Sequence, residues 1–299
     1  MSDANDHHGN GTPPAEVEID EALVRSLLEE EQPELAGLPL THVESGWDNA
    51  TWRLGEELAV RVPRRAIGDL LLRREQAWLP VLAPGLPLPV PAPLHPGEPT
   101  ERYPWAWSVV PWLPGEAVDR SPLRADQAEV LGGFLRALHR PAPEGAPTSE
   151  VRGVPLSARV EGVRERMERL ARTTDAITPR IRSAWEEAQE APLDRSPTWL
   201  HGDLHARNVL AREGAITGVI DWGDLCAGDP ACDLDALWML LPDAAARRAA
   251  REAYGEVSEA TWARARGWAI LIGVVLLDTG LQDTPRHARM GAEVLRRAG

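Results

Sequence analysis

The chain has 299 residues, of which 43% are hydrophobic and 26% are charged, and its formal net charge at pH 7 is −14. This length accommodates one large or two modest domains with buried cores, and the composition excludes a disordered protein. The strong negative charge argues against a nucleic-acid-binding protein, because such proteins carry basic patches.

Membrane and secreted classes are also disfavoured. No apolar run reaches the roughly 18 residues of a membrane span, and the segment MSDANDHHGNGTPP lacks the basic and apolar regions of a secretory signal. We therefore expect a cytoplasmic protein without a membrane partner. The two cysteines, Cys226 and Cys232, are too few for a disulfide framework or a zinc site, and we expect reduced thiols. Every basic residue counted as Lys or Arg is arginine, so the chain contains no lysine.

The first third of the chain predicts a disordered tail and then a small β-rich region. Residues 1–15 are polar and contain Gly and Pro, which predicts disorder. Apolar residues at helical spacing predict a helix over 20–31 and another over 67–82. Between them, three apolar runs predict antiparallel strands at 40–44, 50–54 and 58–62.

The remainder of the chain predicts a short extended region and then mainly helices. Prolines recur from 84 to 99, which predicts an extended connection with one short strand near 92–95. Residues 106–110 predict a buried strand that runs into the linker Pro-Trp-Leu-Pro-Gly-Glu. Periodic apolar positions then predict a series of helices, at 125–139, 160–171, 178–190, 233–241, 244–254, 259–277 and 286–297.

The stretch from Trp199 to Asp235 carries the chemistry. Two apolar runs, 208–211 and 216–220, flank Glu213-Gly214 and predict a small hairpin. The hairpin would bring Asp203, Asn208 and Asp221 to one end. Two carboxylates and an amide oxygen suit Mg²⁺, which prefers oxygen ligands and leaves positions for phosphate.

A second interpretation of this stretch is a hydrolase with a metal cluster. His201, Asp203 and His205 follow the pattern H-x-D-x-H, whose side chains could ligate a metal ion. This interpretation gives Asn208 and Asp221 no role, and no further histidine cluster completes the site. We therefore favour the magnesium interpretation.

The spacing of these residues resembles that of kinases. Asp203 and Asn208 are five residues apart, as in the kinase catalytic loop, and Asp221-Trp222-Gly223 stands where D-F-G would. With HGDLHARN, IDWGD and GDPACDLD, the chain resembles the aminoglycoside phosphotransferase and choline kinase superfamily. The resemblance implies an α+β, bilobal, protein-kinase-like fold with a small antiparallel β lobe and a larger, mainly helical lobe. We expect a nucleotide-binding lobe at 16–110, a hinge at 111–115 and a catalytic and substrate lobe at 116–299.

The resemblance also implies the positions that bind ATP or GTP. The loop 45–49, with Ser45, Trp47 and Asn49, would cover the phosphates, although its single glycine also fits an ordinary hairpin turn. Arg61 occupies the place of the kinase lysine on the third strand, and Glu75 is its expected partner; the alternative is an exposed strand arginine. In the hinge, the expected contacts with the base come from Pro111, Trp112 and Leu113.

The resemblance assigns roles in phosphoryl transfer as well. Asp203 would orient the acceptor hydroxyl and take its proton, while Asn208 and Asp221 would hold Mg²⁺ at the nucleotide. His201 is expected to hydrogen-bond the backbone rather than to transfer protons.

The acceptor is less constrained by the motifs. An aminoglycoside is the leading candidate, because a polycation would bind carboxylates at the mouth of the site, with Trp238 as a wall. Alternatives are a metabolic kinase of a sugar or amino alcohol, a macrolide kinase, and a non-catalytic nucleotide-binding pseudokinase. We expect a monomer or a homodimer. The acidic candidates are Asp229, Asp233, Asp235, Asp278 and Asp283, of which Asp229 and Asp233 also fit a structural loop-to-helix junction.

Overall fold

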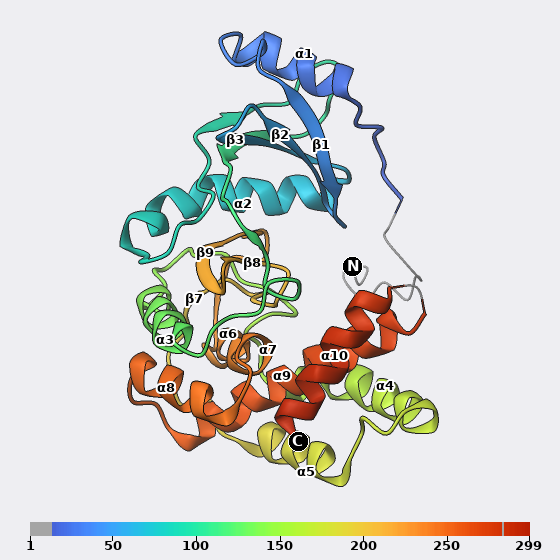
Figure 1. The fold of residues 1–299 in the computed structure, drawn as a ribbon, viewed down its shortest axis with the longest axis vertical. Coiled ribbons are helices and arrows are strands. Elements are labelled where there is room, and N and C mark those ends of the chain that lie inside the picture. Colours follow the sequence, from blue (N-terminus) through green and yellow to red (C-terminus); the bar gives the residue numbers. More distant parts are fainter. Residues whose placement is uncertain (1–13, 283) are drawn as a thin grey trace. The chain divides into compact units, whose positions relative to one another are not determined.

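The structure is a computed structural model that describes residues 14–282 and 284–299 (Figure 1). Its residue contacts define two compact units. The β-rich unit comprises residues 14–114 and 218–223, and the helical unit comprises the described residues from 115 to 217 and from 224 to 299. The predicted disordered tail falls almost entirely outside the described residues, as does Asp283.

An antiparallel sheet of five strands forms the centre of the β-rich unit. Along the sheet the strand order is β1-β2-β3-β5-β4. The three strands predicted at 40–62 and the one at 106–110 are confirmed, with small shifts of their ends. The strands are β1 (Leu40–Ser45), β2 (Asn49–Leu54), β3 (Leu58–Pro63), β4 (His95–Gly97) and β5 (Trp107–Pro111).

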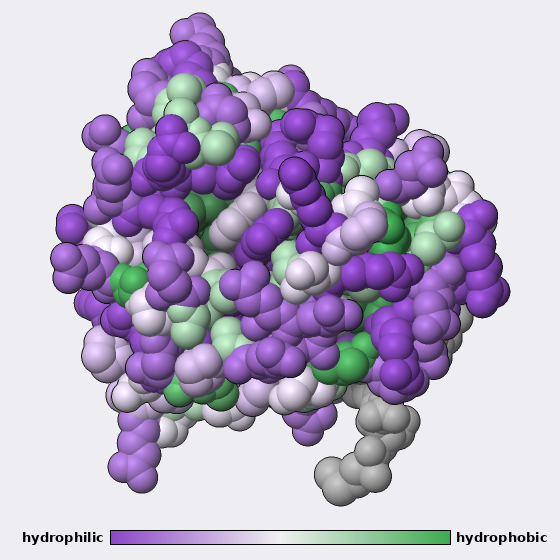
Figure 2. All heavy atoms as spheres, turned by 90° about the horizontal axis from the view of Figure 1, so that it is seen from below, coloured by the Kyte–Doolittle hydropathy of each residue, from purple (hydrophilic) through white to green (hydrophobic). Residues whose placement is uncertain are grey.

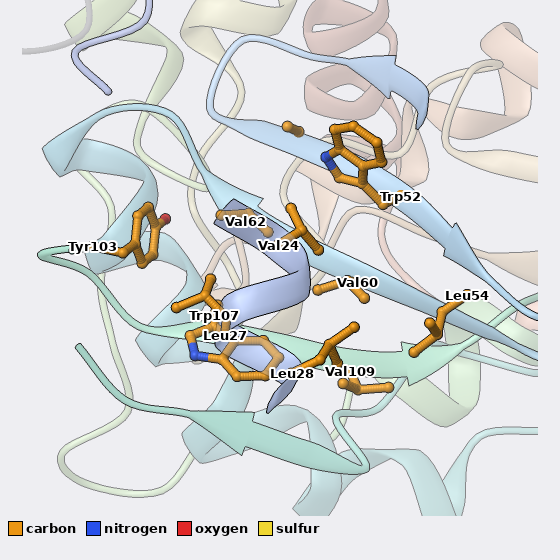
Figure 3. Close-up of a cluster of buried hydrophobic side chains, with 11 residues drawn as sticks. Val24, Leu27, Leu28, Trp52, Leu54, Val60, Val62, Tyr103, Trp107 and Val109 are labelled. Atoms are coloured by element: carbon orange, nitrogen blue, oxygen red, sulfur yellow. The ribbon is translucent and has the colours of Figure 1, made fainter. Parts of the chain in front are cut away.

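The core of the β-rich unit lies between the sheet and helix α1 (Glu21–Glu31). Along β2 the buried side chains alternate with partly exposed ones, as expected for a strand that buries one face. Helix α1 begins at Asp20, whose carboxylate accepts the Leu23 N–H at 2.8 Å. Figure 3 shows the apolar cluster, which includes Val24, Leu27, Leu28, Trp52, Leu54, Val60, Val62, Tyr103, Trp107 and Val109. A second helix, α2 (Ala66–Leu82), packs against β3 and β5.

The strand predicted near 92–95 is found at 95–97, as β4. In β4, Gly97 pairs with Trp107, and a Cβ at Gly97 would lie 2.1 Å from the indole ring. The close approach of this ring therefore requires glycine at 97 and fixes the register. Because β4 is an edge strand, it also tolerates Pro96, which lacks an N–H.

The helical unit is organised around the long helix α9 (Glu259–Gly280), which packs against α4, α5, α6 and α10 (Figure 1). Of the helices in the described part of the chain, α9 is the one whose length and composition would suffice to cross a membrane, and 72% of its most apolar window is buried. A core helix shows such burial. The other helices are α3 (Gln127–Leu138), α4 (Val160–Thr173), α5 (Pro179–Glu190), α6 (Ala231–Leu234), α7 (Ala236–Leu240), α8 (Ala244–Tyr254) and α10 (Pro285–Ala298).

One predicted helix, 233–241, is instead two short helices. The first, α6, begins directly after Pro230, which fits a helix start because proline has no N–H to satisfy there. The second, α7, begins after Asp235, and the two helices meet at this residue. Two short 3-10 turns occur elsewhere, at Ala83–Gly85 and Leu156–Arg159.

Short strands accompany the helices, and the last two residues of one of them, 218–219, belong to the β-rich unit. The predicted hairpin is confirmed by β8 (Val209–Arg212) and β9 (Ala215–Val219), with positive φ angles of 53° at Glu213 and 76° at Gly214. Two further pairings were not predicted. The strand β6 (Glu116–Ala117) pairs with β8, and β7 (Thr198–Leu200) pairs with β10 (Cys226–Gly228). These last two strands flank the predicted catalytic segment.

The face of the protein shown in Figure 2 is mainly hydrophilic, and the apolar residues on it occur in small, separate groups. This distribution agrees with the burial of the apolar faces of the helices in the core. Cys226 and Cys232 are both buried, and neither takes part in a disulfide bond in the described part of the chain.

Substitutions at two adjacent glycines of α3 can test how α3 packs in this unit. A Cβ at Gly132 would lie 2.3 Å from the carbonyl oxygen of Ala250 in α8, whereas a Cβ at Gly133 has no neighbour within 4 Å. We expect Gly132→Ala to lower the free energy of unfolding by about 1–3 kcal/mol. Gly133→Ala should raise it by up to about 1 kcal/mol, because alanine favours the helix. Denaturant unfolding of both variants checks the pair, and equal effects would contradict the described α3–α8 contact.

Candidate active site

The predicted catalytic loop lies in the helical unit, between β7 and β8. Gly202 has a φ angle of +84°, and a Cβ there would lie 2.6 Å from the Asp224 carbonyl oxygen. Both features require glycine at this position. His201 is fully buried, and its Nδ1 accepts the Asp203 N–H at 3.2 Å. His201 therefore hydrogen-bonds the backbone, as predicted.

The carboxylate of Asp233 anchors this loop. It accepts the backbone N–H groups of His201 at 2.6 Å and of Gly202 at 2.8 Å, and it is completely buried. His139 Nε2 lies 3.4 Å from the same carboxylate, and Tyr254 Oη lies 2.9 Å from His139 Nδ1. The loop is thus fixed by a buried network of residues from α6, from α8 and from the position directly after α3.

Asp203 and Asn208 are brought together in the helical unit. Asn208 Nδ2 donates to the Asp203 carbonyl oxygen at 2.9 Å and to Asp203 Oδ2 at 3.3 Å. Because Nδ2 is used in this way, Oδ1 is the Asn208 atom that could ligate a metal ion. Asn208 is buried and Asp203 is partly exposed, so the carboxylate can reach a substrate.

Arg152 is a site residue that the motifs did not reveal. Its guanidinium lies 2.9 Å from Asp203 Oδ1 and 3.0 Å from Asp224 Oδ2. Burial raises the pKa of Asp203, but the positive charge of Arg152, with contributions from His205, His201 and Asn208, outweighs burial and lowers this pKa to about 2. Asp203 is therefore ionised at neutral pH.

The β-rich unit holds the second cluster, formed by Arg61, Glu75 and Asp221. Arg61 Nη1 lies 2.6 and 2.5 Å from the two carboxylate oxygens of Glu75, which is completely buried. Arg61 Nη2 donates to Asp221 Oδ1 at 3.0 Å. Burial alone would lower the pKa of Arg61, but the charges of Glu75 and Asp221 raise it overall. Arg61 is thus a buried, paired residue and not an exposed one.

Asp221 itself has an unusual backbone. Its φ angle of +63° is uncommon for a residue other than glycine and marks local strain. The side chain is 55% exposed despite its contact with Arg61, and so it can still meet a ligand. The following Trp222 is completely buried and donates its indole N–H to the Val219 carbonyl oxygen at 3.0 Å.

The predicted phosphate loop, residues 45–49, is held against the start of α2. Arg64 donates to the Gly46 carbonyl oxygen at 2.7 Å, and Arg65 pairs with Asp48 at 2.7 Å. Gly68 lies in α2, and a Cβ there would lie 2.6 Å from the Asp48 carbonyl oxygen. The close approach of the loop to the helix therefore requires glycine at 68. Of the three predicted phosphate-binding residues, Ser45 is hydrogen-bonded to His42, Trp47 is exposed, and Asn49 begins β2.

The predicted hinge residues begin with the last residue of β5. The Trp112 N–H donates to the Glu57 carbonyl oxygen at 2.7 Å, so this N–H is not available for a nucleotide base. The guanidinium of Arg53 lies 5.0 Å from the centroid of the Trp112 ring. Pro111 is the last residue of β5, opposite Leu58, and Leu113 is partly exposed.

Asn208 and Asp221 fit a magnesium ion by their chemistry. Each offers an oxygen, and a site with few protein ligands leaves positions for phosphate oxygens and water, as Mg²⁺ prefers. Asn208 belongs to the helical unit and Asp221 to the β-rich unit, so their convergence stays a prediction. No group of three His, Cys, Asp or Glu side chains within residues 14–282 and 284–299 could hold a metal ion, so the hydrolase interpretation has no support.

The residues predicted to bind the acceptor are engaged within the helical unit. Arg264 Nε lies 2.6 Å from Asp229, and Arg169 Nη2 lies 2.7 Å from Asp278. Asp233 anchors the catalytic loop. Asp235 is buried, and its Oδ1 has no hydrogen-bond partner within residues 14–282 and 284–299. Burial, together with the charge of Asp233, raises the pKa of Asp235 well above the usual value. Trp238 is partly exposed, and its carbonyl oxygen accepts from Arg297.

Known structures share this fold. The GDP complex of wild-type aminoglycoside 2'-phosphotransferase-IIIa is 17% identical, with a TM-score of 0.68, and the match covers 94% of this chain and 98% of that chain. The macrolide 2'-phosphotransferase MphH from Brachybacterium faecium is 22% identical, with a TM-score of 0.58 and coverages of 92% and 97%. The streptomycin–ATP–APH(2")-IIa ternary complex is 19% identical, with a TM-score of 0.58 and coverages of 94% and 97%.

Sequence comparison identifies the family. No curated protein matches this chain. The model of the phosphotransferase enzyme family (APH), however, matches residues 39–268, which include both candidate clusters. The predicted α+β kinase-like fold is confirmed. The chain belongs to the phosphotransferase enzyme family and is a small-molecule kinase.

Proposed function

We propose that this kinase transfers the γ-phosphate of ATP or GTP to a hydroxyl group of a small molecule, with Mg²⁺ as cofactor. The observation that carries the proposal is the pair of clusters: Asp203 with Asn208 in the helical unit, and Arg61 with Glu75 and Asp221 in the β-rich unit. These are the groups that a kinase uses for the acceptor, the metal and the phosphates. The proposal requires the two clusters to meet at the bound nucleotide.

The β-rich unit is the proposed nucleotide-binding lobe. Residues 45–49 would cover the phosphates, and Arg61, fixed by Glu75, would bind them through its guanidinium fork. Residues 111–115 would join the lobes and contact the base through the Pro111 carbonyl and the Leu113 N–H. Bound Mg²⁺ would supply positive charge to the phosphates, and the residues that would hold it are Asn208 and Asp221.

Asp203 is the proposed catalytic residue of the helical unit. Its pKa of about 2 makes it a weak base, so its first task is to orient the acceptor hydroxyl. Phosphoryl transfer through a loose transition state needs little proton removal before the phosphorus–oxygen bond forms. The hydroxyl becomes strongly acidic as it bonds to phosphorus, and Asp203 then accepts its proton. Positioning therefore matters more here than basicity.

We infer the chemical class of the acceptor from the partners that the candidate carboxylates already have within the protein. An aminoglycoside would need several free carboxylates, but Asp229 and Asp278 are paired with arginines and Asp233 is bound to the backbone. This pairing supports an acceptor with few cationic groups, such as a macrolide antibiotic, over the aminoglycoside that leads on sequence grounds. A soluble, cytoplasmic enzyme remains the proposed setting.

The role of Asp203 can be tested by Asp203→Asn, which keeps the shape of the side chain and removes its charge. We expect kcat to fall by roughly 10²- to 10⁴-fold, because the hydroxyl loses its orienting base. Nucleotide affinity, measured by calorimetry, should change little. The control is Asp126→Asn, which alters an exposed aspartate of the same unit. A near-normal kcat for Asp203→Asn would remove this residue from the mechanism.

The role of Arg61 can be tested by comparing Arg61→Ala with Arg61→Lys. Arg61→Ala removes a charged hydrogen bond to the nucleotide phosphates. We expect this loss to raise the activation free energy for kcat/KM of the nucleotide by about 1.5–3 kcal/mol. Arg61→Lys should keep part of the activity, because lysine can still pair with Glu75. The activity should not be complete, because lysine lacks the second nitrogen that donates to Asp221. Steady-state kinetics with varied nucleotide decides this.

A control for stability is needed in the Arg61 experiment, since Arg61→Ala leaves the charge of Glu75 buried and unpaired. Kinetics should therefore be measured at temperatures where circular dichroism shows each variant folded. An unchanged kcat/KM for the nucleotide in folded Arg61→Ala would disprove the proposed phosphate contact.

The charge of the acceptor can be tested by salt. For an acceptor with few cationic groups, we expect KM to vary little between ionic strengths of about 0.01 M and 1 M, where the screening length falls from about 30 Å to 3 Å. The KM for the nucleotide, measured in parallel, reports general salt effects. A steep, selective rise in the KM of the best acceptor would support a polycation instead.

A further inference from the structure

We propose that Arg152 is the positioning residue of the catalytic carboxylate: it holds Asp203 Oδ1 and leaves Oδ2 to the acceptor hydroxyl. The inference rests on the proposed function of Asp203 and extends it to a residue outside the recognised motifs. Arg152 lies 51 residues before Asp203 in the chain, in the loop between α3 and α4.

The two carboxylate oxygens of Asp203 have different partners. Nη2 of Arg152 lies 2.9 Å from Oδ1. Among the described residues, the contacts of Oδ2 are longer: Asn208 Nδ2 lies at 3.3 Å and His205 Nε2 at 3.5 Å. A carboxylate held firmly at one oxygen cannot rotate freely about its Cβ–Cγ bond. The oxygen with the weaker contacts is the one that can accept a hydrogen bond from a substrate.

Arg152 also binds Asp224, and this contact links two parts of the helical unit. Nε and Nη2 lie 3.1 and 3.0 Å from Asp224 Oδ2. The Asp224 backbone approaches the catalytic loop closely at Gly202, where no side chain fits. One guanidinium therefore lies between two carboxylates and reduces their mutual repulsion, and it joins the loop before β8 to the segment before β10.

The loop that carries Arg152 is built to hold it in place. Ser149 Oγ accepts the N–H groups of Val151 at 3.2 Å and of Arg152 at 3.0 Å. The carbonyl oxygen of Gly153 accepts the Asp229 N–H at 2.9 Å. Gly153 has a φ angle of +61°, and a Cβ there would lie 2.9 Å from the Gly228 Cα. The Ser149 side chain thus fixes the backbone up to Arg152. Contacts with Gly228 and Asp229 fix the backbone at the next residue, Gly153.

The surroundings of Arg152 show why an arginine is needed. Its side chain is 21% exposed, and its charge also interacts with the buried carboxyl group of Asp235. Only a planar guanidinium can donate to Asp203 and to Asp224 in fixed directions at the same time. A lysine would keep the charge but lose this geometry.

The first test compares Arg152→Ala with Arg152→Lys. The assay measures ATP or GTP turnover with kanamycin and a macrolide, and also with water as acceptor. In Arg152→Ala we expect kcat to fall by about 10²-fold, because a carboxylate displaced by about 1 Å loses that much rate. The KM for the nucleotide should change by about twofold or less. Arg152→Lys should recover part of kcat, and the control Arg164→Ala, which removes an exposed arginine of α4, should match the native enzyme.

A double-mutant cycle shows whether Arg152 acts through Asp203. In the Asp203→Asn background there is no carboxylate to position, so Arg152→Ala should lower kcat further by about twofold or less. A purely structural role would instead give the same fold-loss in both backgrounds. Equal losses in the two backgrounds, or a native kcat in folded Arg152→Ala, would overturn the inference.

The cycle also separates this inference from the proposed function. If Asp203→Asn retains a normal kcat, the proposed role of Asp203 fails and the inference fails with it. If Asp203→Asn is impaired while Arg152→Ala is not, only the positioning role fails. Where Arg152→Ala does not fold, Arg152→Lys in both backgrounds provides the same comparison, because it retains the charge and changes only the geometry.

Discussion

The buried carboxylate of Asp233 makes the contacts on which the candidate catalytic loop depends. It receives two consecutive backbone N–H groups, those of His201 and Gly202, and removing it would leave both donors unsatisfied in the interior. Asp203 directly follows Gly202 in the chain, so the contacts of Asp233 also determine where Asp203 lies. His139 and Tyr254 extend the network to α3 and α8, which joins the placement of the loop to the packing of the helical unit.

Arginine takes the place of lysine throughout this kinase, and both candidate clusters use its forked geometry. Arg61 binds Glu75 with one nitrogen and Asp221 with the other, while Arg152 bridges Asp203 and Asp224. A lysine offers one point charge at such a position, whereas a guanidinium fixes two partners in direction. The two arginines therefore organise the acidic groups of the two units separately, and each leaves one carboxylate, Asp203 or Asp221, partly exposed to ligands.

Local patterns in the sequence predicted much of the fold. Apolar periodicity located the long helices and the β8–β9 hairpin, and the spacing of Asp203, Asn208 and Asp221 indicated a kinase. The remainder depends on contacts between distant residues. The strands β7 and β10 are too short to show a period, and Arg152 stands in a loop without a motif. Asp278 was predicted to bind substrate, but its arginine partner is 109 residues away in the chain, and only the folded structure brings the two together.

The claim that this protein is a Mg²⁺-dependent small-molecule kinase is tested most directly by one acceptor panel. Aminoglycosides, macrolides, sugars and amino alcohols are each incubated with ATP or GTP, with and without Mg²⁺, and release of nucleoside diphosphate is followed alongside the mass of the acceptor. The account predicts that at least one acceptor gains a single phosphate for each diphosphate released, and only when Mg²⁺ is present. Tight nucleotide binding without phosphorylation of any acceptor would contradict it and indicate a pseudokinase.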